Sequence, residues 1–245
     1  MGRLSGKVAL ITGAGKGIGK AIAIAYAKQG IKTCCLARTL NDIELTASEI
    51  KTLGGEAVAI LCDVTNYEDL EIAMQKAFNQ FGWIDIIVIN AGTDCEKLPI
   101  DKLDIEEWKR VIDVNLSGAF YTAKAAIPYL KRNGAGKIIT IGSGMGHKGR
   151  VNSASYSCSK AGLWMLTRIL AQELSEYKIS VNELIPGPVN TDMGNDSKKD
   201  NQSAFSINGE WIKCPEDVVD LAIFLAGQPD IGPTAQSFSL MRRDI

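Results

Sequence analysis

Seven short apolar segments recur along the chain, and the longer stretches between them repeat apolar residues at every third or fourth position. The short segments predict strands, whereas the spacing in the longer stretches is typical of helices with one buried face. Strand therefore alternates with helix throughout the sequence. The predicted strands are residues 7–12, 32–37, 56–62, 84–90, 136–142, 178–185 and 235–240.

This alternation favours an α/β fold with a doubly wound, mostly parallel seven-stranded sheet and helices on both faces. Strands that are buried on both sides explain why their apolar runs are almost continuous. The alternative is a closed eight-stranded barrel, which needs an eighth strand that the sequence does not show. No linker, repeat or low-complexity tract divides the chain, so we expect residues 1–245 to form a single domain.

One segment breaks the alternation. The stretch "NTDMGNDSKKDNQSAFSINGE" (190–210) is polar and has no period, and it is too long for a simple connection in a compact domain. We expect a substrate lid at about 190–212. Plain disorder is the alternative, because the same composition is typical of unfolded segments.

The overall composition excludes several kinds of protein. Hydrophobic residues make up 46% and charged residues 22% of the chain, which is normal for a globular protein with a sizeable core. The formal net charge of -1 lacks the basic excess of a nucleic-acid-binding surface. The six cysteines have no metal-type spacing, and no apolar stretch is long enough for a signal peptide or a membrane span. We expect a soluble, cytoplasmic protein without a metal, nucleic-acid or membrane partner.

A glycine-rich turn follows the first predicted strand, in the stretch "TGAGKGIG", and a helical stretch follows it. Glycines in such a turn let the backbone approach a pyrophosphate, and the start of the helix offers free N–H groups to it. A P-loop is excluded because no Gly-Lys-Ser/Thr follows. A glycine turn without a ligand is the alternative. The expected cofactor-binding residues here are Gly13, Lys16, Gly17, Ile18 and Gly19.

The end of the second predicted strand indicates which dinucleotide binds. An acid at this place would bind the ribose 2′-hydroxyl, but the stretch "CCLARTL" has none, and Asp42 lies further on, where a helix cap is expected. Arg38 occupies the position instead, and Lys16 lies in the glycine turn. Two cations suit a 2′-phosphate and predict NADP(H) as the cofactor. The alternative is that both are solvated surface charges.

The stretch "SYSCSKAG" places Tyr156 and Lys160 four residues apart at the start of a helical pattern. Residues at this spacing lie on one face of a helix, so a phenol and an ammonium group would share a small volume. A nearby ammonium favours the phenolate and lowers the pKa of a tyrosine, which suits a general acid and base. A surface pair formed by chance is the alternative.

Together these motifs, in order along nearly the whole chain, resemble the single-domain short-chain dehydrogenase/reductase family. The resemblance adds "CDV" as an adenine-contacting site, "INAG" as the central-strand signature and "IPGPVNT" as the nicotinamide-side loop. It implies a Rossmann-type fold and a catalytic tetrad of Asn115, Ser143, Tyr156 and Lys160. The further cofactor-binding residues that it implies are Asp63, Val64, Asn90, Gly92, Pro186, Gly187, Val189 and Thr191, together with Tyr156 and Lys160.

The resemblance also implies an activity. It predicts an NADP(H)-dependent oxidoreductase, similar to 3-oxoacyl-carrier-protein reductases, that transfers hydride reversibly between the nicotinamide and a carbonyl or secondary alcohol. Tyr156 would exchange the proton, Lys160 would hold the nicotinamide ribose, Ser143 would orient the carbonyl and Asn115 would hold a water. A sugar or polyol dehydrogenase and a non-catalytic dinucleotide sensor are alternatives. A small-molecule substrate and a homo-oligomer are therefore the expected partners.

Assembly as a homodimer or homotetramer would use two long predicted helices, around 104–132 and 155–175. The ending "AQSFSLMRRDI" differs from the apolar strand and Asp-Gly-Gly that are common in the family, so dimer and tetramer stay open. His147, the single histidine, lies near Ser143 and would either line the substrate entrance or play no part. Trp164 and Met165 are expected to be core or interface residues.

Overall fold

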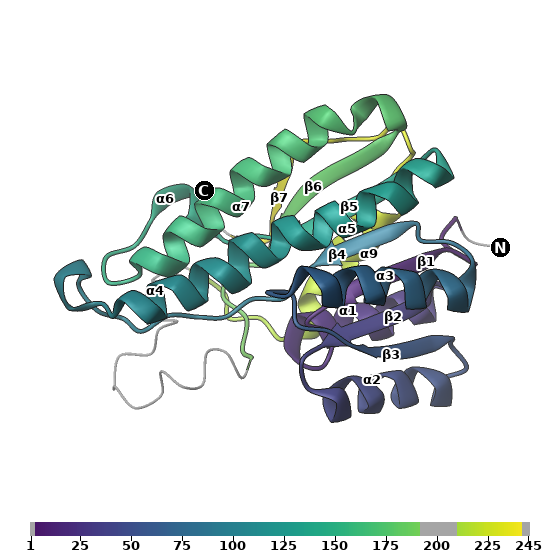
Figure 1. Cartoon of the computed structure of the whole chain (residues 1–245), viewed down its shortest axis with the longest axis horizontal. Coiled ribbons are helices and arrows are strands. Elements are labelled where there is room, and N and C mark those ends of the chain that lie inside the picture. Colours follow the sequence, from purple (N-terminus) through teal and green to yellow (C-terminus); the bar gives the residue numbers. More distant parts are fainter. Residues whose placement is uncertain (1–2, 192–209, 242–245) are drawn as a thin grey trace.

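The computed structural model describes residues 3–191 and 210–241. Their strands form one parallel sheet of seven, in the order β3-β2-β1-β4-β5-β6-β7 (Figure 1). The predicted doubly wound α/β fold is confirmed, and each strand lies within two residues of its predicted bounds. The strands are β1 (Val8–Thr12), β2 (Lys32–Ala37), β3 (Ala57–Leu61), β4 (Ile86–Ile89), β5 (Gly136–Ile141), β6 (Ile179–Ile185) and β7 (Ser237–Ser239).

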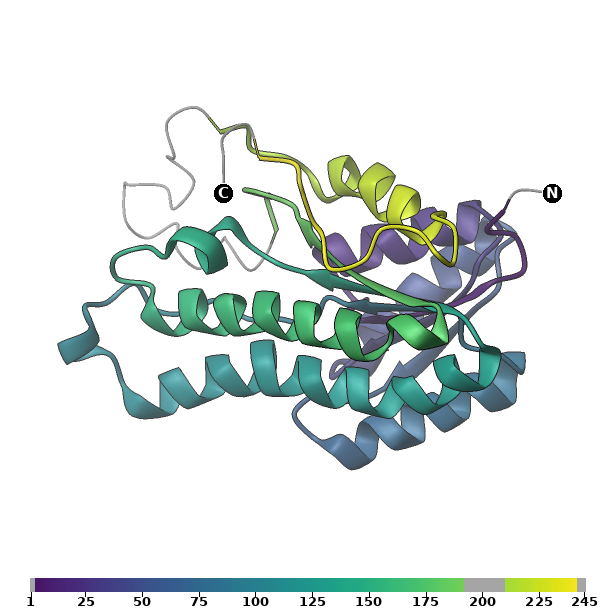
Figure 2. The same cartoon turned by 90° about the horizontal axis from the view of Figure 1, so that it is seen from above.

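Helices connect the strands and cover both faces of the sheet, as Figure 2 shows. A π-helical turn (Asp113–Ser117) joins α4 to α5, so the first long predicted helix is one rod with a local irregularity. Short 3-10 helices span Ile100–Lys102, Ser175–Tyr177 and Pro215–Val218. The α-helices are α1 (Gly17–Lys28), α2 (Leu40–Thr52), α3 (Tyr67–Phe81), α4 (Ile105–Ile112), α5 (Gly118–Asn133), α6 (Gly144–Lys148), α7 (Ala154–Glu173) and α9 (Val219–Ala226).

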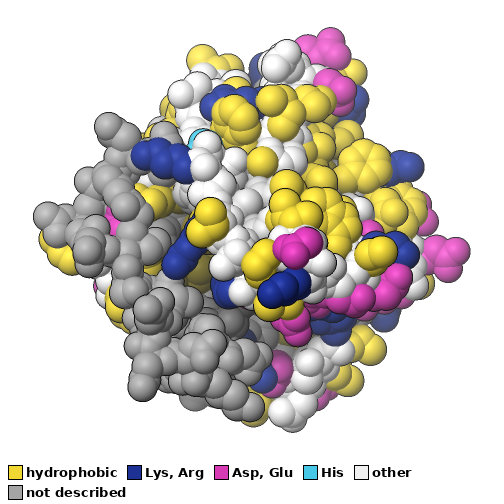
Figure 3. Space-filling model, turned by 90° about the vertical axis from the view of Figure 1, so that its left-hand side faces the viewer, with side chains coloured by type: hydrophobic (Ala, Val, Ile, Leu, Met, Phe, Trp, Pro, Cys, Tyr) yellow, Lys and Arg dark blue, Asp and Glu magenta, His cyan; other side chains and the backbone are white. Residues whose placement is uncertain are grey.

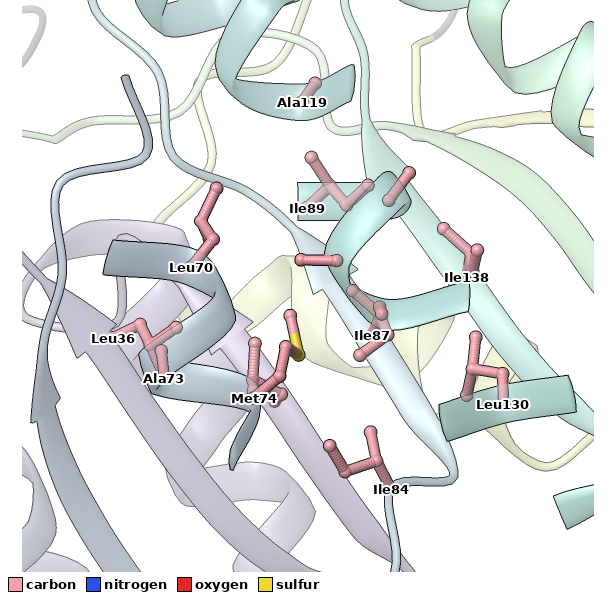
Figure 4. Close-up of a cluster of buried hydrophobic side chains, with 14 of the residues drawn as sticks. Leu36, Leu70, Ala73, Met74, Ile84, Ile87, Ile89, Ala119, Leu130 and Ile138 are labelled. Atoms are coloured by element: carbon pink, nitrogen blue, oxygen red, sulfur yellow. The ribbon is translucent and has the colours of Figure 1, made fainter. Parts of the chain in front are cut away.

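Two apolar clusters hold the layers together. One lies between the sheet and helices α3, α5 and α7, and includes Leu70 and Met74 of α3 against Ile87 of β4 (Figure 4). The other joins the opposite face to α1, α2 and α9, with Tyr26 fully buried and its hydroxyl donating to the carbonyl of Ala222 at 2.9 Å. Because both faces are covered, the strands are apolar along almost their whole length.

The strand order reverses between β1 and β4, which pair with each other in the middle of the sheet. In open α/β sheets, ligands bind beyond the carboxyl ends of the strands at such a switch point. The residues that follow β1 and β4 are therefore placed to form a site.

The predicted lid at about 190–212 lies largely outside the described residues. The chain on its two sides is joined, because Val189 and Lys213 form a parallel bridge. The N–H of Asn190 donates to the carbonyl of Lys213 at 2.8 Å, and the N–H of Lys213 donates to Pro188 at 3.0 Å. Within the described ranges, no helix combines the length and the apolar character needed to cross a membrane.

The packing of α3 generates a stability prediction. Leu70→Ala should lower the free energy of unfolding by about 2–5 kcal/mol, because it leaves a cavity under a completely buried side chain. Ile72→Ala, in the same helix at a position that is 53% exposed, should change it by less than about 0.5 kcal/mol. Urea denaturation measures both, and equal losses would contradict this orientation of α3.

Candidate active site

The ends of β1 and β4 are tied together by Thr12 and Asn90. The Thr12 hydroxyl accepts hydrogen bonds from the N–H groups of Asn90 and Ala91, both at 3.0 Å. In return, the Asn90 amide donates to the carbonyls of Thr12 at 2.8 Å and Gly13 at 3.2 Å. Asn90 is thus placed at the site, where its side chain holds the glycine turn against β4. Thr12 was not predicted, although a hydroxyl at the end of an apolar strand is a usable signal.

The glycine turn has the geometry of an anion-binding loop. Gly13 and Gly17 have positive φ angles of 67° and 54°, which side chains other than glycine rarely adopt. A Cβ on Gly19 would lie 2.3 Å from the carbonyl oxygen of Gly13, so the start of α1 lies directly on the turn. The residue before the helix, Lys16, makes no capping hydrogen bond through its side chain, and the first turn has no acid. The N–H groups of this turn therefore suit the pyrophosphate of a dinucleotide.

The other expected residues of this region lie beside the turn or on the loop that leads to it. Ile18 packs against the apolar cluster beside α1, and Thr191 reaches the turn from beyond β6, since a Cβ on Gly17 would lie 3.2 Å from its methyl group. In the residues that precede Thr191, Gly187 has a φ angle of 71° and Val189 is buried. The loop that contains Pro186 therefore runs from the end of β6 to the glycine turn.

The two expected cofactor-binding cations, Arg38 and Lys16, each lie near an acid. Arg38 lies 3.9 Å from a carboxylate oxygen of Asp63, and Lys16 forms an ion pair with Asp42 at 3.2 Å. The predicted capping role of Asp42 is wrong, because α2 begins at Leu40 and places Asp42 in its first turn. Lys16 and Arg38 are both more than half exposed, so their ammonium and guanidinium groups remain open to an anionic ligand.

The residues expected to contact the adenine, Asp63 and Val64, follow β3. The Asp63 carboxylate accepts hydrogen bonds from the N–H of Thr65 at 3.0 Å and from its hydroxyl at 2.8 Å, which closes the turn after the strand. Val64 is buried against α5, because a Cβ on Gly118 would meet its side chain at 2.8 Å. Both residues therefore lie at the same sheet edge as the glycine turn.

The structure brings the four tetrad residues together at the start of α7. Ser143, the N-cap residue of α6, acts on the Tyr156 phenol and lowers its pKa. The Lys160 ammonium lies 5.8 Å from the centre of the Tyr156 ring and donates to the carbonyl of Ile141 at 2.8 Å. A Cβ on Gly92 would lie 3.4 Å from the Asn115 amide oxygen and 3.8 Å from the Lys160 nitrogen.

Asn115 occupies the π-helical turn and is almost completely buried. Its amide group donates to the carbonyl of Thr93 at 3.0 Å and to the hydroxyl of Ser159 at 3.0 Å, and its amide oxygen accepts from the N–H of Thr93 at 2.7 Å. A single π-turn inside a helix often marks a functional site. Here the turn lets Asn115 join the segment after β4 to helix α7.

Burial dominates the electrostatics of Tyr156 and Lys160. Loss of hydration and the nearby Asp94 carboxylate raise the pKa of Tyr156 to about 12, although Ser143 acts in the opposite direction. Burial lowers the pKa of Lys160 to about 8, against a raising effect from Glu183. The expected lowering of the Tyr156 pKa by Lys160 is not seen, because loss of hydration dominates and raises this pKa.

The single histidine is a partly buried neighbour of the site. His147 lies on α6, its Nε2 atom is 3.0 Å from a carboxylate oxygen of Glu183, and its ring centre is 5.0 Å from that of Trp164. Met165, the next residue on α7, is 47% exposed. Glu183 was missed, although an acid inside the apolar stretch "ISVNELI" was a signal. Residues 3–191 and 210–241 contain no group of acids, cysteines and histidine that could hold a metal ion.

Comparison with known proteins identifies the family. Residues 7–202 match the short chain dehydrogenase family. The chain belongs to this family. The resemblance inferred from the motifs is therefore confirmed, and short chain dehydrogenases are oxidoreductases.

Similar proteins cover nearly the whole of this short chain dehydrogenase. The 3-oxoacyl-(acyl-carrier-protein) reductase of Synechocystis sp. is 34% identical over 242 residues, which are 98% of this chain and 97% of that protein. A 3-ketoacyl-(acyl-carrier-protein) reductase from Brucella melitensis, complexed with NADH, has a TM-score of 0.88, 32% identity and 97% coverage of both chains. An actinorhodin polyketide ketoreductase variant with NADPH has a TM-score of 0.89 and 29% identity, covering 98% of this chain and 97% of its own.

The crowding around the glycine turn can be tested with two matched substitutions. Gly13→Ala would place a Cβ 2.8 Å from the Asn90 amide nitrogen, whereas Gly134→Ala, at a similar positive φ, would meet no atom within 4 Å. Both variants should lose about 1–2 kcal/mol of stability from backbone strain. Only Gly13→Ala should also weaken NADPH or NADH binding, measured by nucleotide fluorescence, and equal binding by both variants would contradict a nucleotide at this turn.

Proposed function

We propose that this protein is an NADP(H)-dependent oxidoreductase that interconverts a carbonyl compound and a secondary alcohol, with Tyr156 as the general acid and base. The observation that supports this proposal is the Tyr156 phenol, which lies beside the buried ammonium of Lys160 and is influenced by Ser143, at the sheet edge that also contains the glycine turn. A protein that only bound a dinucleotide would not need a proton donor there.

The bound nicotinamide would supply or accept the hydride, and the residues of the chain would control the proton. In reduction, the substrate oxygen accepts hydrogen bonds from Tyr156 and Ser143, and Tyr156 transfers its proton to that oxygen. Its raised pKa of about 12 keeps the phenol protonated at neutral pH, which suits the reductive direction. Lys160 would hold the nicotinamide ribose, and Asn115 would hold a water that connects Lys160 with solvent.

The preference for NADP(H) is supported by the charges beside the glycine turn. Arg38 is 64% exposed at the end of β2, and no acid stands at that position to bind a free ribose 2′-hydroxyl. A guanidinium group can bind a phosphate through two hydrogen bonds. Lys16 adds a second cation, although its ion pair with Asp42 leaves less of its charge available to the cofactor.

Arg38→Leu should therefore weaken NADPH binding much more than NADH binding, by about 1–3 kcal/mol if one charged hydrogen bond is lost. Lys28→Leu is the matched control, because Lys28 is an exposed cation at the far end of α1. Isothermal titration with both nucleotides measures the effect. Equal affinity of the unmodified protein for NADPH and NADH would refute the proposed preference.

A substrate of the 3-oxoacyl thioester class is proposed from the similarity to 3-oxoacyl-(acyl-carrier-protein) reductases. Sugar or polyol oxidation is the alternative within the family. Following NADPH oxidation with β-ketoacyl thioesters, keto sugars, other ketones and quinones distinguishes these classes. A protein that binds NADPH but turns over none of them would instead be a dinucleotide sensor.

Assembly as a homodimer or homotetramer, in the cytoplasm, is part of the proposal. Large apolar side chains are exposed on the long helices, including Trp108 on α4, Phe120 on α5 and Ile169 on α7. Figure 3 views the molecule from the side of α4 and α6, and hydrophobic side chains gather on the part of this face that is not grey. Contact with a second copy would cover such side chains.

The role of Tyr156 can be tested once a substrate is found. Tyr156→Phe should lower kcat by about 10²–10⁴-fold, because general acid catalysis is lost. NADPH affinity should stay almost unchanged, since the ring remains. Stopped-flow measurement of hydride transfer separates this loss from slow product release.

Tyr177→Phe is the matched control, because Tyr177 lies beyond the end of α7 and contacts Lys131 rather than the site. Its turnover should equal that of the unmodified protein. Near-normal turnover by Tyr156→Phe would show that another group moves the proton.

A further inference from the structure

A carboxylate is buried deep beneath the tetrad. Glu183 lies in the middle of β6 and is completely inaccessible to solvent. One of its carboxylate oxygens lies 3.0 Å from the Nε2 atom of His147 and accepts a hydrogen bond from the Ser237 hydroxyl at 2.6 Å. The other oxygen has no hydrogen-bond partner. Since an isolated buried charge is costly, this carboxylate requires cations close by.

The backbone beside Glu183 is shaped around its side chain. A Cβ on Gly142 would coincide with the unpartnered carboxylate oxygen, at a separation of 1.8 Å. The adjacent carbonyl, that of Ile141, accepts the hydrogen bond from the Lys160 ammonium at 2.8 Å. The carboxylate and the ammonium group therefore both lie at the peptide group that joins Ile141 to Gly142.

The same carboxylate contacts the short helix α6, whose N-cap residue is Ser143. His147 is at the last turn of this helix, α6, and its contact with Glu183 joins α6 to β6. On the other side α6 lies directly on α7, because a Cβ on Gly146 would be 2.6 Å from the backbone of Lys160. Glu183 thus contacts the elements that position both Ser143 and Lys160.

We propose that Glu183 is a positioning residue for the reaction, which balances the buried positive charge of Lys160 and anchors, through His147, the turn that contains Ser143. This inference rests on the proposed function. Glu183 would be a fifth functional residue, which lies behind the four predicted catalytic residues and does not contact the substrate.

The electrostatic effect has a definite sign. Burial lowers the pKa of Lys160 to about 8, and the Glu183 carboxylate raises it. A lysine must be protonated to act as a cation, so Lys160 loses its charge as the pH rises through this value. Removing the negative charge of Glu183 should therefore shift that loss to lower pH. The ionisable groups near the two residues include His147 on α6, Tyr156 on α7, and Asp94 and Lys97 after β4.

Glu183→Gln tests the proposal because glutamine has nearly the same shape and can still accept the Ser237 hydrogen bond. Carbonyl reduction should remain within a few fold of the unmodified protein at slightly acid pH. The decline of kcat at alkaline pH should move down by about one pH unit. A decline at the unmodified position would overturn the proposal.

His147→Gln is the matched control, since it removes the partner of Glu183 but leaves the carboxylate facing Lys160. Its alkaline decline should stay at the unmodified position or move up. An equal downward shift in both variants would mean that disturbed packing, rather than charge, causes the effect, and would refute the proposal.

A second readout does not depend on turnover. In protein labelled with carbon-13 at the lysine ε-carbons, the Lys160 signal, assigned by its loss in Lys160→Met, should titrate about one pH unit lower in Glu183→Gln than in the unmodified protein. If the Lys160 signal shifts but the protein reduces no carbonyl compound, the proposed function is refuted, whereas the proposed charge balance between Glu183 and Lys160 stands. Activity without the shift would refute the role of Glu183 alone.

Discussion

The pairing of β1 with β4 is the constraint on which the site depends. These central strands are neighbours although two strands and three helices separate them in the sequence, and the strand order reverses between them. In open α/β sheets, ligands bind beyond the carboxyl ends of the strands at such a point. Where these strands end, the Thr12 hydroxyl accepts from the N–H of Asn90, and the Asn90 amide donates to the carbonyl of Thr12. These side chains therefore bond backbone groups that would otherwise have no partner. The glycine turn is therefore held in place before any ligand binds.

Buried charge is the second constraint. Lys160 must be shielded from water to lie beside Tyr156, yet burial disfavours the ammonium that the proposed chemistry needs. A backbone carbonyl, that of Ile141, provides one partner. Glu183 provides negative charge from a different strand, and Gly142 makes room for it. The inner wall of the site is thus a small set of polar groups enclosed by apolar layers.

The cofactor edge shows the opposite environment. Lys16 and Arg38 are exposed, and each has an acid nearby, Asp42 and Asp63. Exposed ion pairs contribute little to stability, so a phosphate could replace these partners at small cost. The proposed nucleotide would therefore meet exposed cations at its adenosine end and a largely buried arrangement near the nicotinamide.

Much of this protein was predictable from local sequence patterns. The seven strands follow from short apolar runs, because a sheet covered on both faces needs buried residues at every position. The glycine turn and the Tyr156–Lys160 spacing are also local, since a few neighbouring residues determine a turn or the face of a helix. The resemblance to the family, built from such motifs, added Asn115 and Ser143 to this group as a prediction.

The contacts that join distant segments were decided only by the tertiary structure. The pairing of Lys16 with Asp42 and of His147 with Glu183 depends on the packing of helices against the sheet, and neither spacing in the sequence indicates a contact. The raised pKa of Tyr156 likewise depends on burial, which the sequence alone does not reveal. Local patterns determined which residues could perform the chemistry, whereas strand register and helix packing determined which charges lie next to them, because electrostatic interactions act through space rather than along the chain.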